Sequence, residues 1–596
     1  MLKLPYGISN FHTVRNEGYY YIDRTACLPV LESSGKQLVF LRPRRFGKSL
    51  FLSMLAYYYD IHQAEQFKGL FGNLAIGSQP SAEHNQYLIL RWDFSKVSGQ
   101  GTITEIKHSL FSHLNISIEG FAAKYQAELK KPIVINSEDA IASFQSLCSA
   151  LSFGERKLYL LIDEYDNFAN EVLIHQNDGQ QRYKDLLAGE GIVKTLFKVI
   201  KASAAEGAIA RVFITGVSPV VLADMTSGYN VATSIYLNEE FNQLCGITEV
   251  ELSQLVQQVA QESCTEQTDY QALLTTMREY YNGYRFCYDL NYPTIYNPTL
   301  CFYFLQYYQR RCQAPFEMLD GNLAMDAGRI RYMAKLPAGA QVIEQILDDE
   351  NPVTVKHLAT QFGVEQLNEL RTNPDYIASL MYFFGVLTIV DIQGLNKLVL
   401  KAPNLVTKAL YVEEFKRHLF PESRERQRLQ SLVEDFYQSG ELEPLADYLE
   451  QTTLSTLSNR DYQWSNELTI KMAFLTPLFD DSYYIIDSEA TVRRRYSDLV
   501  MIIRPSLRET LPTLRDLVLE FKYLKLSEVG MSGTQVRESS REALLQLPAV
   551  QTQLQAALEQ LEDYQTTLVQ RYQQPERLVC LAVVAVGFER VVWQRL

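Results

Sequence analysis

Residues 42–49, Arg-Pro-Arg-Arg-Phe-Gly-Lys-Ser, join an apolar run at 37–41 to a helix-forming run at 50–59. A loop between a strand and a helix can bind phosphate, because its backbone N–H groups point at the anion and the N-terminus of the helix favours negative charge. Further along, up to about residue 220, short apolar runs alternate with helical stretches. This alternation predicts an α/β domain with a largely parallel sheet.

The residues at the end of this loop have expected roles. Gly47 lets the backbone approach the phosphates closely, Lys48 neutralises their charge, and the Ser49 hydroxyl ligates Mg²⁺. The pattern G-x-x-x-x-G-K-[ST] begins with glycine where this chain has Arg42, so the start of the loop needs another backbone path. The arginines of the loop are expected either to clamp phosphate or to pair with surface carboxylates: Arg42, Arg44 and Arg45. Taken alone, the loop also fits an ordinary helix start.

A second motif follows at 157–162, an apolar strand that ends in Asp163 and Glu164, which is the layout of a Walker B motif. We expect Asp163 to hold Mg²⁺ through water and Glu164 to polarise the attacking water. Carboxylates at the end of a strand are otherwise often helix caps or solvated loop residues.

A third apolar strand, 211–215, leads into the turn 216–219. ATPases of the AAA type place a polar sensor of the γ-phosphate on a strand between the two Walker strands. Thr215 and Ser218 are the candidates for this role, and a polar turn after a buried strand is the alternative for each.

Six sequence blocks together resemble the bacterial AAA-ATPase-like family. They are YGISNF (6–11), EGYYYID (17–23), RPRRFGKS (42–49), IDEYD (162–166), TGVSP (215–219) and YNGYRF (281–286). The resemblance implies ATP and Mg²⁺ as cofactors, and it implies that a loop without the first glycine is tolerated. Members of the family commonly end in a PD-(D/E)XK nuclease domain.

The C-terminal region contains residues for such a nuclease. Asp498 precedes the strand 499–503, and the strand 517–522 carries Glu520 and Lys522, which share one face because they are two residues apart. Phosphodiester hydrolysis needs acidic oxygens to hold Mg²⁺ and a lysine to orient the nucleophile or stabilise the developing charge. An E-x-K triplet on its own is more often a coincidence.

Other residues near this site are weaker candidates. Gln560 and Tyr564, four apart on a helix expected at 554–568, resemble the Q-x-x-x-Y motif of one exonuclease-like branch of the superfamily. Glu467 is a further metal ligand candidate, with solvent exposure as its alternative. A basic rim that holds phosphates, or else a solvated face, is expected from Arg493, Arg494, Arg495, Arg504 and Lys525.

The length of 596 residues predicts several domains. We expect an α/β multidomain chain, in which an AAA-like P-loop core with a parallel sheet is followed by a helical lid, a helical or winged-helix-like connector with short strands at 387–390 and 397–400, and a restriction-endonuclease-like α/β domain. The expected bounds are 1–239, 240–345, 346–455 and 456–596.

Bulk properties limit the remaining possibilities. No apolar run is long enough to span a membrane, and the eight cysteines form no C-x-x-C pair, so we expect reduced thiols and a cytoplasmic protein. The net charge of −14 argues against a generic nucleic-acid coat, so any nucleic-acid site depends on local basic residues.

The sequence therefore predicts an ATP-binding and ATP-hydrolysing protein that is coupled to Mg²⁺-dependent cleavage of nucleic acid, with DNA favoured over RNA and with homo-oligomers expected. Two alternatives stay open. One is an ATP-binding regulator or scaffold whose nuclease-like domain only binds nucleic acid. The other is a nuclease with a nucleotide site that binds without turnover.

Overall fold

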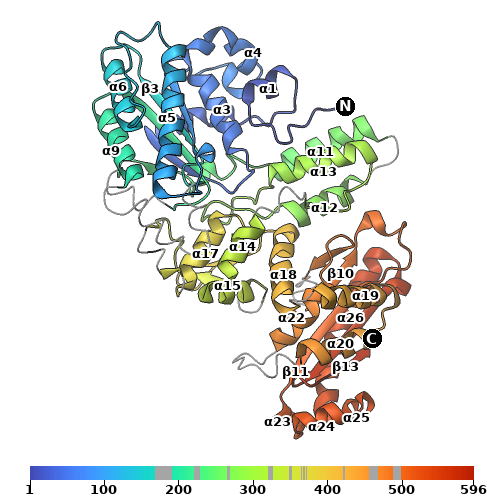
Figure 1. The fold of residues 1–596 in the computed structure, drawn as a ribbon. Helices are drawn as coiled ribbons and strands as arrows, with labels where there is room; N and C mark the ends of the chain where they lie inside the picture. The colour runs from blue at the N-terminus through green and yellow to red at the C-terminus, as the bar shows by residue number, and fades with distance from the viewer. Residues whose placement is uncertain are drawn as a thin grey trace.

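The computed structural model describes the residue ranges 1–167, 191–220, 229–264, 269–319, 326–347, 352–363, 372–420, 423–454, 467–487 and 498–596, together with residues 366, 369 and 370. Figure 1 shows an α/β part at each end of the molecule, with the helices of the central region between them. One apolar core runs from the N-terminal sheet through these helices to the C-terminal sheet. The parts are therefore packed on one another.

The N-terminal sheet has five parallel strands in the order β2-β3-β4-β1-β5. Strand β3 is buried at every position, which is the pattern of a strand covered on both faces. The strands are β1 Gln37–Leu41, β2 Leu88–Asp93, β3 Leu158–Asp163, β4 Ile209–Gly216 and β5 Thr233–Ser234. The helices of this part are α1 Phe11–Asn16, α2 Leu28–Ser34, α3 Lys48–Tyr59, α4 Phe67–Phe71, α5 Ile103–Lys124, α6 Ala140–Ser152 and α9 Ile192–Ala205. The predicted parallel α/β fold is confirmed.

The segment after this sheet is helical. Its helices are α11 Glu249–Ser263, α12 Tyr270–Tyr281, α13 Pro298–Arg311, α14 Asp326–Ala334 and α15 Pro337–Leu347. Helix α11 begins with a capping box, in which Thr248 and Glu251 satisfy each other's backbone N–H groups. Helix α13 begins with Pro298 directly after the capping side chain of Asn297.

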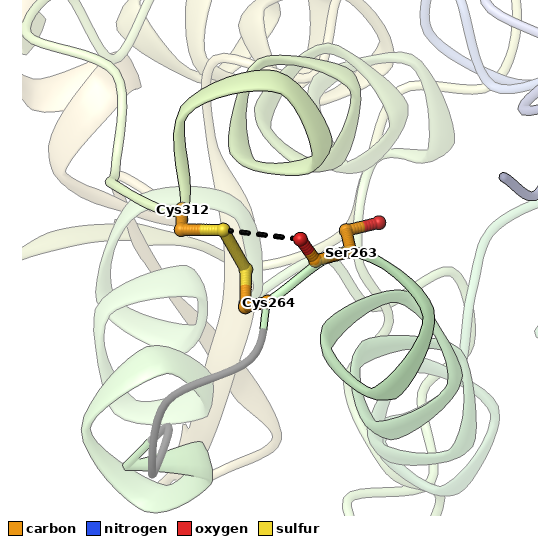
Figure 2. The surroundings of a disulfide bond; sticks show 3 residues. All are labelled: Ser263, Cys264 and Cys312. Atoms are coloured by element: carbon orange, nitrogen blue, oxygen red, sulfur yellow. Dashed lines mark hydrogen bonds between the residues drawn. A yellow bond between two sulfur atoms is a disulfide. The ribbon is translucent and has the colours of Figure 1, made fainter.

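A disulfide joins Cys264, just past α11, to Cys312, just past α13 (Figure 2). The two Cα atoms are 5.8 Å apart, and Cys312 Sγ lies 3.4 Å from the carbonyl oxygen of Ser263. The expectation of reduced thiols is therefore wrong for this pair. The spacing of the cysteines did not reveal the bond, because it depends on how α11 packs against α13. The other cysteines are free: Cys27, Cys148, Cys245, Cys287, Cys301 and Cys580.

The connector contains a three-stranded antiparallel sheet in the order β6-β8-β7. Its strands are β6 Val353–Val355, β7 Thr388–Gln393 and β8 Lys397–Lys401, and its helices are α17 Pro374–Phe383, α18 Leu405–Leu419, α19 Ser423–Ser439 and α20 Glu443–Leu449. The two strands expected from the sequence are present as the hairpin β7-β8. Strand β6 was not expected, because three residues give too short a pattern.

The C-terminal sheet has the order β13-β12-β11-β10-β9, and only β11 and β12 run parallel. Its strands are β9 Tyr484–Asp487, β10 Leu499–Ile503, β11 Asp516–Leu524, β12 Leu578–Val586 and β13 Arg590–Arg595, and its helices are α22 Glu467–Leu478, α23 Leu526–Val529, α24 Gly533–Glu538, α25 Arg541–Leu545 and α26 Pro548–Tyr572.

Alternating residues of β10 and β11 divide the core of this part in two. One set packs with residues of α22 and the other with residues of α26, so these helices cover opposite faces of the sheet. The expected α/β domain at the C-terminal end is confirmed. Within the described ranges, none of the helices combines the length and the apolar character that crossing a membrane requires.

Candidate functional site

The phosphate-binding loop turns into α3 through two residues in the left-handed region, Arg45 at φ 66° and Gly47 at φ 91°. Glycine suits the second position because it has no β-carbon to clash. The Lys48 side chain folds back over the loop and donates hydrogen bonds to the carbonyl oxygens of Arg42 and Pro43, both at 3.0 Å. These are weak competitors for phosphate oxygens, so the ammonium is held ready inside the loop.

Arg42, at the position of the missing glycine, is 1% exposed. Its guanidinium lies over the rings of Phe40 and Phe286, at 4.4 and 4.2 Å from the ring centroids. It donates hydrogen bonds of 2.6 to 2.8 Å to the carbonyl oxygens of Leu41, Tyr236 and Phe241. The side chain therefore fastens the start of the loop to the segment after β5.

The other residues of the loop also have protein partners. Arg44 donates a hydrogen bond of 3.0 Å to the Asn167 side chain, and the carbonyl of Arg45 accepts one of 2.8 Å from the Thr299 hydroxyl. Ser49 lies half-buried in the first turn of α3. The loop is thus tied both to the end of β3 and to α13.

The Walker B aspartate lies at the end of β3, next to β4. Asp163 is 2% exposed; its Oδ1 accepts a hydrogen bond of 2.7 Å from the Thr215 hydroxyl, and its Oδ2 accepts one of 3.1 Å from Arg91. Strand β4 separates β1 from β3, so Thr215 lies between the two Walker strands, as expected for a sensor. Arg91, on β2, was not identified from the sequence, because only the strand order brings it to Asp163.

Glu164 has a left-handed backbone with φ 49°, which is strained for glutamate. Burial raises the pKa of Glu164, while the positive charges of Lys48 and Arg44 oppose that rise. Burial likewise lowers the pKa of Lys48, and Glu164 and then Asp163 oppose that change. These shifts put Lys48 and both carboxylates into one electrostatic cluster, as the two Walker motifs require.

Ser218, the second sensor candidate, is engaged elsewhere. Its hydroxyl and its backbone N–H donate to Asp166 Oδ2 at 2.7 and 2.8 Å, and the Val217 N–H donates to Oδ1. The Tyr165 hydroxyl donates to the carbonyl of Ser218 at 2.6 Å. Of the two candidates, Thr215 is therefore the one that the structure brings to Asp163.

A small cavity of about 70 Å³ opens beside the loop. Its lining is mostly apolar and comes from the N-terminal segment, the start of α3 and the helical region: Pro5, Tyr20, Tyr21, Ile22, Arg24, Phe46, Gly47, Leu50, Phe51, Leu244, Cys245, Gly246, Pro298 and Phe302. Arg24 is held by Glu251 and by the carbonyl of Gly246.

The second cluster lies in the C-terminal sheet. The antiparallel register of β10 and β11 puts Asp498 opposite Glu520. The Asp498 N–H donates to Glu520 Oε2 at 3.3 Å, and the Phe521 N–H donates to Asp498 Oδ2 at 2.8 Å. Lys522 donates to Glu520 Oε1 at 2.9 Å. The structure thus brings together the three residues that the sequence proposed for this site.

The electrostatics of this cluster suit a divalent cation. Glu520 is 2% exposed, and burial followed by the charge of Asp498 raises its pKa to about 7, against the influence of Lys522. Asp498 is half-buried beside it, and a cation between two carboxylates that repel each other relieves this repulsion, so these two residues could hold Mg²⁺. Within the described ranges, no group of three or more His, Cys, Asp or Glu side chains could hold a metal ion.

Lys471 is a member of the cluster that the sequence did not indicate. It lies on α22, and its Nζ is 3.3 Å from Asp498 Oδ1. Glu467 begins the same helix, but its side chain lies outside the described residues.

The helix α26 carries both residues of the Q-x-x-x-Y pattern and packs on β11 and β12. Tyr564 is buried in the apolar cluster that includes Val518. The Gln560 Oε1 atom is buried and finds no hydrogen-bond donor among the residues that the structure describes. Both side chains belong to the face of the sheet that also carries Glu520 and Lys522.

The expected basic rim is wrong at Arg504. This residue is 1% exposed, and its guanidinium donates to the carbonyl oxygens of Pro315, Phe316 and Ser482. It holds the C-terminal part against the helical region, because the position after β10 faces the interior. Lys525 is exposed beside α23, and residues 493–495 lie outside the described ranges.

Comparisons with known proteins find a separate family match for each of the two parts of the chain that carry these clusters. Residues 5–226 match the family model described as "Predicted AAA-ATPase", and residues 465–595 match that of the PD-(D/E)XK nuclease superfamily. The chain therefore carries an AAA-ATPase-like domain and, at its C-terminal end, a PD-(D/E)XK nuclease-superfamily domain, as the resemblance implied.

Individual relatives are more distant. A protein of Azotobacter chroococcum mcd 1, described as an uncharacterized protein in the vnfD 5′ region, is 27% identical over 437 residues, which are 70% of this chain and 71% of that protein. The Aeropyrum pernix ORC1 protein in complex with DNA matches at 12% identity and a TM-score of 0.27, over 66% of this chain and 93% of that one. Cdc6p from Pyrobaculum aerophilum matches at 11% identity and a TM-score of 0.23, over 68% and 91%.

Proposed function

We propose that this chain, with its AAA-ATPase-like and PD-(D/E)XK nuclease-superfamily domains, binds and hydrolyses ATP and couples the nucleotide to Mg²⁺-dependent cleavage of nucleic acid. The main support is that the fold forms two separate clusters of charged side chains, and each cluster contains the groups that one of these reactions needs. Lys48, Asp163 and Glu164 form the first group, and Asp498, Glu520 and Lys522 form the second.

In the first site, the triphosphate lies in the loop that ends at Gly47, and Lys48 exchanges its two carbonyl partners for phosphate oxygens. Asp163 and Ser49 would hold Mg²⁺, which would supply positive charge to the phosphates. The Thr215 hydroxyl donates to Asp163 and is thereby held between the Walker strands; as a sensor it would turn its single proton from Asp163 to a γ-phosphate oxygen.

Glu164 is suited to the hydrolytic step. A carboxylate whose pKa is raised by burial is a better proton acceptor than an exposed one, so Glu164 can orient and polarise the attacking water. The purine base occupies the apolar cavity beside the loop, where the aromatic rings of Tyr20 and Phe302 supply flat contact surface. Arg42 holds the loop in place and does not touch the phosphates.

In the second site, Asp498 and Glu520 would hold Mg²⁺, which would supply positive charge to the scissile phosphate and activate the attacking water. Lys522 orients the nucleophile and stabilises charge on the phosphate oxygens. Gln560 and Tyr564 line the substrate side of the sheet, and the unsatisfied Gln560 oxygen is available to a polar group of the substrate. Glu467 stays a candidate ligand.

Contacts through the YNGYRF segment support coupling between the two sites. The Phe46 ring of the loop packs edge-on against Tyr284 and Phe286, with centroids at 4.9 and 5.4 Å. Directly before this segment, the Tyr280 hydroxyl donates to the carbonyl of Tyr484 on β9 at 2.7 Å. A shift of the loop when ATP binds can therefore reach the C-terminal sheet through packed side chains.

The ATPase part is tested by phosphate release from the full chain. We expect Lys48→Ala to abolish ATP binding and Glu164→Gln to keep binding but to slow turnover by a hundredfold or more, on the order of a lost general base. Lys36→Ala, at an exposed lysine before β1, is a matched control. Equal rates in wild type and both variants would remove the ATPase function.

The nuclease part is tested with labelled single- and double-stranded DNA and RNA, in Mg²⁺ or EDTA, with and without ATP. We expect cleavage only in Mg²⁺, its loss in Asp498→Ala and Lys522→Ala, and a change in rate on adding ATP. Coupling is refuted if ATP leaves the cleavage rate unchanged in wild type and in Lys48→Ala alike.

A second function is favoured by the charge of the C-terminal cluster. Two lysines, Lys471 and Lys522, lie against the two carboxylates, so the cluster is neutral without a metal. A nuclease-like domain that grips nucleic acid without cutting it would have this composition. Binding to every substrate above without cleavage in any metal would establish that function, and the chain would then be an ATP-dependent regulator or scaffold.

Three further expectations complete the proposal. DNA is the first substrate to test, homo-oligomers are expected because AAA-type sites often need a neighbouring subunit, and the protein is expected in the cytoplasm. Sedimentation with and without ATP tests the oligomers.

A further inference from the structure

The two carboxylates of the C-terminal cluster are held in the same way. Each uses one oxygen to accept a backbone N–H from the neighbouring strand, since Asp498 Oδ2 accepts from Phe521 and Glu520 Oε2 accepts from Asp498. Each presents its other oxygen to a lysine. Lys522 is 2.9 Å from Glu520 Oε1, and Lys471 is 3.3 Å from Asp498 Oδ1.

The two lysines reach the cluster from different layers. Lys522 lies on β11, two residues from its partner, as the family pattern has it. Lys471 comes from α22, on the face of the sheet opposite α26. Its neighbours Ile470 and Met472 are buried, and Lys471 itself is only 7% exposed. A lysine is rarely buried to this degree unless it is paired, so its approach to Asp498 is a built part of the site.

The position of Lys471 limits how many metal ions the cluster can take. Two divalent cations side by side need bridging and flanking acidic oxygens, since their own repulsion has to be overcome. Asp498 and Glu520 are the two carboxylates that the described part of the chain brings to this cluster, and each already accepts a backbone N–H and an ammonium. A second cation next to Asp498 Oδ1 would also lie where the ammonium of Lys471 lies.

We propose that Lys471 serves as a fixed positive charge in place of a second divalent cation, so that this site binds one Mg²⁺ ion between Asp498 and Glu520. The inference rests on the nuclease function proposed above. Lys471 is a positioning residue, which holds Asp498 and balances its charge while the metal occupies the side facing Glu520. An ammonium is suited to this because it is a compact point charge.

Calcium titration by calorimetry tests the proposal on the full chain, without nucleotide or nucleic acid. Asp163→Asn is present in all samples, because it removes the carboxylate that would hold a divalent cation in the nucleotide site. We expect one Ca²⁺ per chain, lost in Asp498→Ala. In Lys471→Met, which keeps the length of the side chain and removes its charge, we expect Ca²⁺ to bind at least about tenfold more tightly or a second ion to bind, because a repelling charge next to the metal is gone.

Lys471→Arg is the matched control, because it keeps the charge, and it should bind one Ca²⁺ as the wild type does. Lys471→Gln repeats the test with a polar side chain, and the difference in melting temperature between EDTA and Ca²⁺ reports binding independently in each variant. Two Asp498-dependent ions in the wild type, or unchanged affinity and stoichiometry in both neutral variants, would overturn the inference alone. The absence of any Asp498-dependent Ca²⁺ would overturn the metal-dependent nuclease function with it.

Discussion

Replacing Arg42 by glycine would give the phosphate-binding loop its consensus residue, yet we expect this change to damage the protein. The Arg42 guanidinium bonds to the distant carbonyls of Tyr236 and Phe241. A hydrogen bond to a charged group contributes about 1.5–3 kcal/mol, and removing its donor strips a buried carbonyl of that partner. Burial lowers the pKa of Arg42 to about 10, so the group is still charged at pH 7.

The two long-range hydrogen bonds, with the stacking on Phe40 and Phe286, give an expected loss of about 4 kcal/mol in unfolding free energy for Arg42→Gly. Denaturant unfolding of the full chain, followed at the transition that ATP shifts, measures this loss. We also expect weaker ATP binding, since the loop loses its anchor. Arg42→Lys keeps the charge but lacks the planar guanidinium, so its unfolding free energy and its ATP affinity should lie between those of the wild type and Arg42→Gly.

The reasoning is wrong if Arg42→Gly unfolds like the wild type and binds ATP equally well or more tightly. In that case the arginine would be a tolerated departure from the pattern, and its carbonyl partners would find water at no loss. A tighter site in the glycine variant would also reopen the expectation that the loop arginines act on phosphate.

Three other predictions concern stability and the nucleotide site. In EDTA, the unfolding free energy of the C-terminal domain should fall by about 3 kcal/mol between pH 5 and pH 8. The reason is that the native Glu520 pKa of about 7 lies above its usual value, so the native state binds the proton more tightly than the unfolded state does. Melting temperatures measured against pH should show this fall in the wild type and not in Glu520→Gln. Reducing the bond between Cys264 and Cys312, which are 48 residues apart, should lower stability by up to about 4 kcal/mol, and a melting temperature unaffected by reductant would contradict this. Gly216→Ala should weaken ATP binding at least about tenfold, because the added β-carbon would lie 2.5 Å from Asp166 Oδ1; equilibrium titration with a fluorescent ATP analogue measures it, and unchanged affinity would show that the turn can move aside.

The strands that carry the sites could be predicted because they are continuous apolar runs between polar turns. The ranges 37–41 and 499–503 agree with the observed strands residue for residue. The strands missed were short or lie at an edge. Strand β5 has two exposed residues, and β13 mixes polar and apolar residues because its end is exposed. Neither strand has a run of apolar residues long enough to distinguish it from a loop in the sequence.

Residues at the ends of those strands could be predicted for the same reason, since parallel strands bring their carboxyl ends to one edge. Partners from other elements could not be. Arg91 meets Asp163 only because β2 lies beside β3, and Lys471 meets Asp498 only because α22 covers the sheet. Burial was equally hidden, because nothing in the sequence separates a surface arginine from Arg504, which is enclosed between two parts of the chain.

The YNGYRF segment packs closely against the connector at Pro403 and Asn404, and its glycine makes this approach possible. Gly283 has φ +99°, and a β-carbon there would lie 1.9 Å from the carbonyl oxygen of Pro403, so only glycine allows this approach. The preceding residue, Asn282, is bound to the same segment, since the Asn404 side chain donates to the Asn282 carbonyl at 2.7 Å. If ATP binding shifts the phosphate loop as proposed, we expect the connector to move with this segment, because close-packed groups shift together.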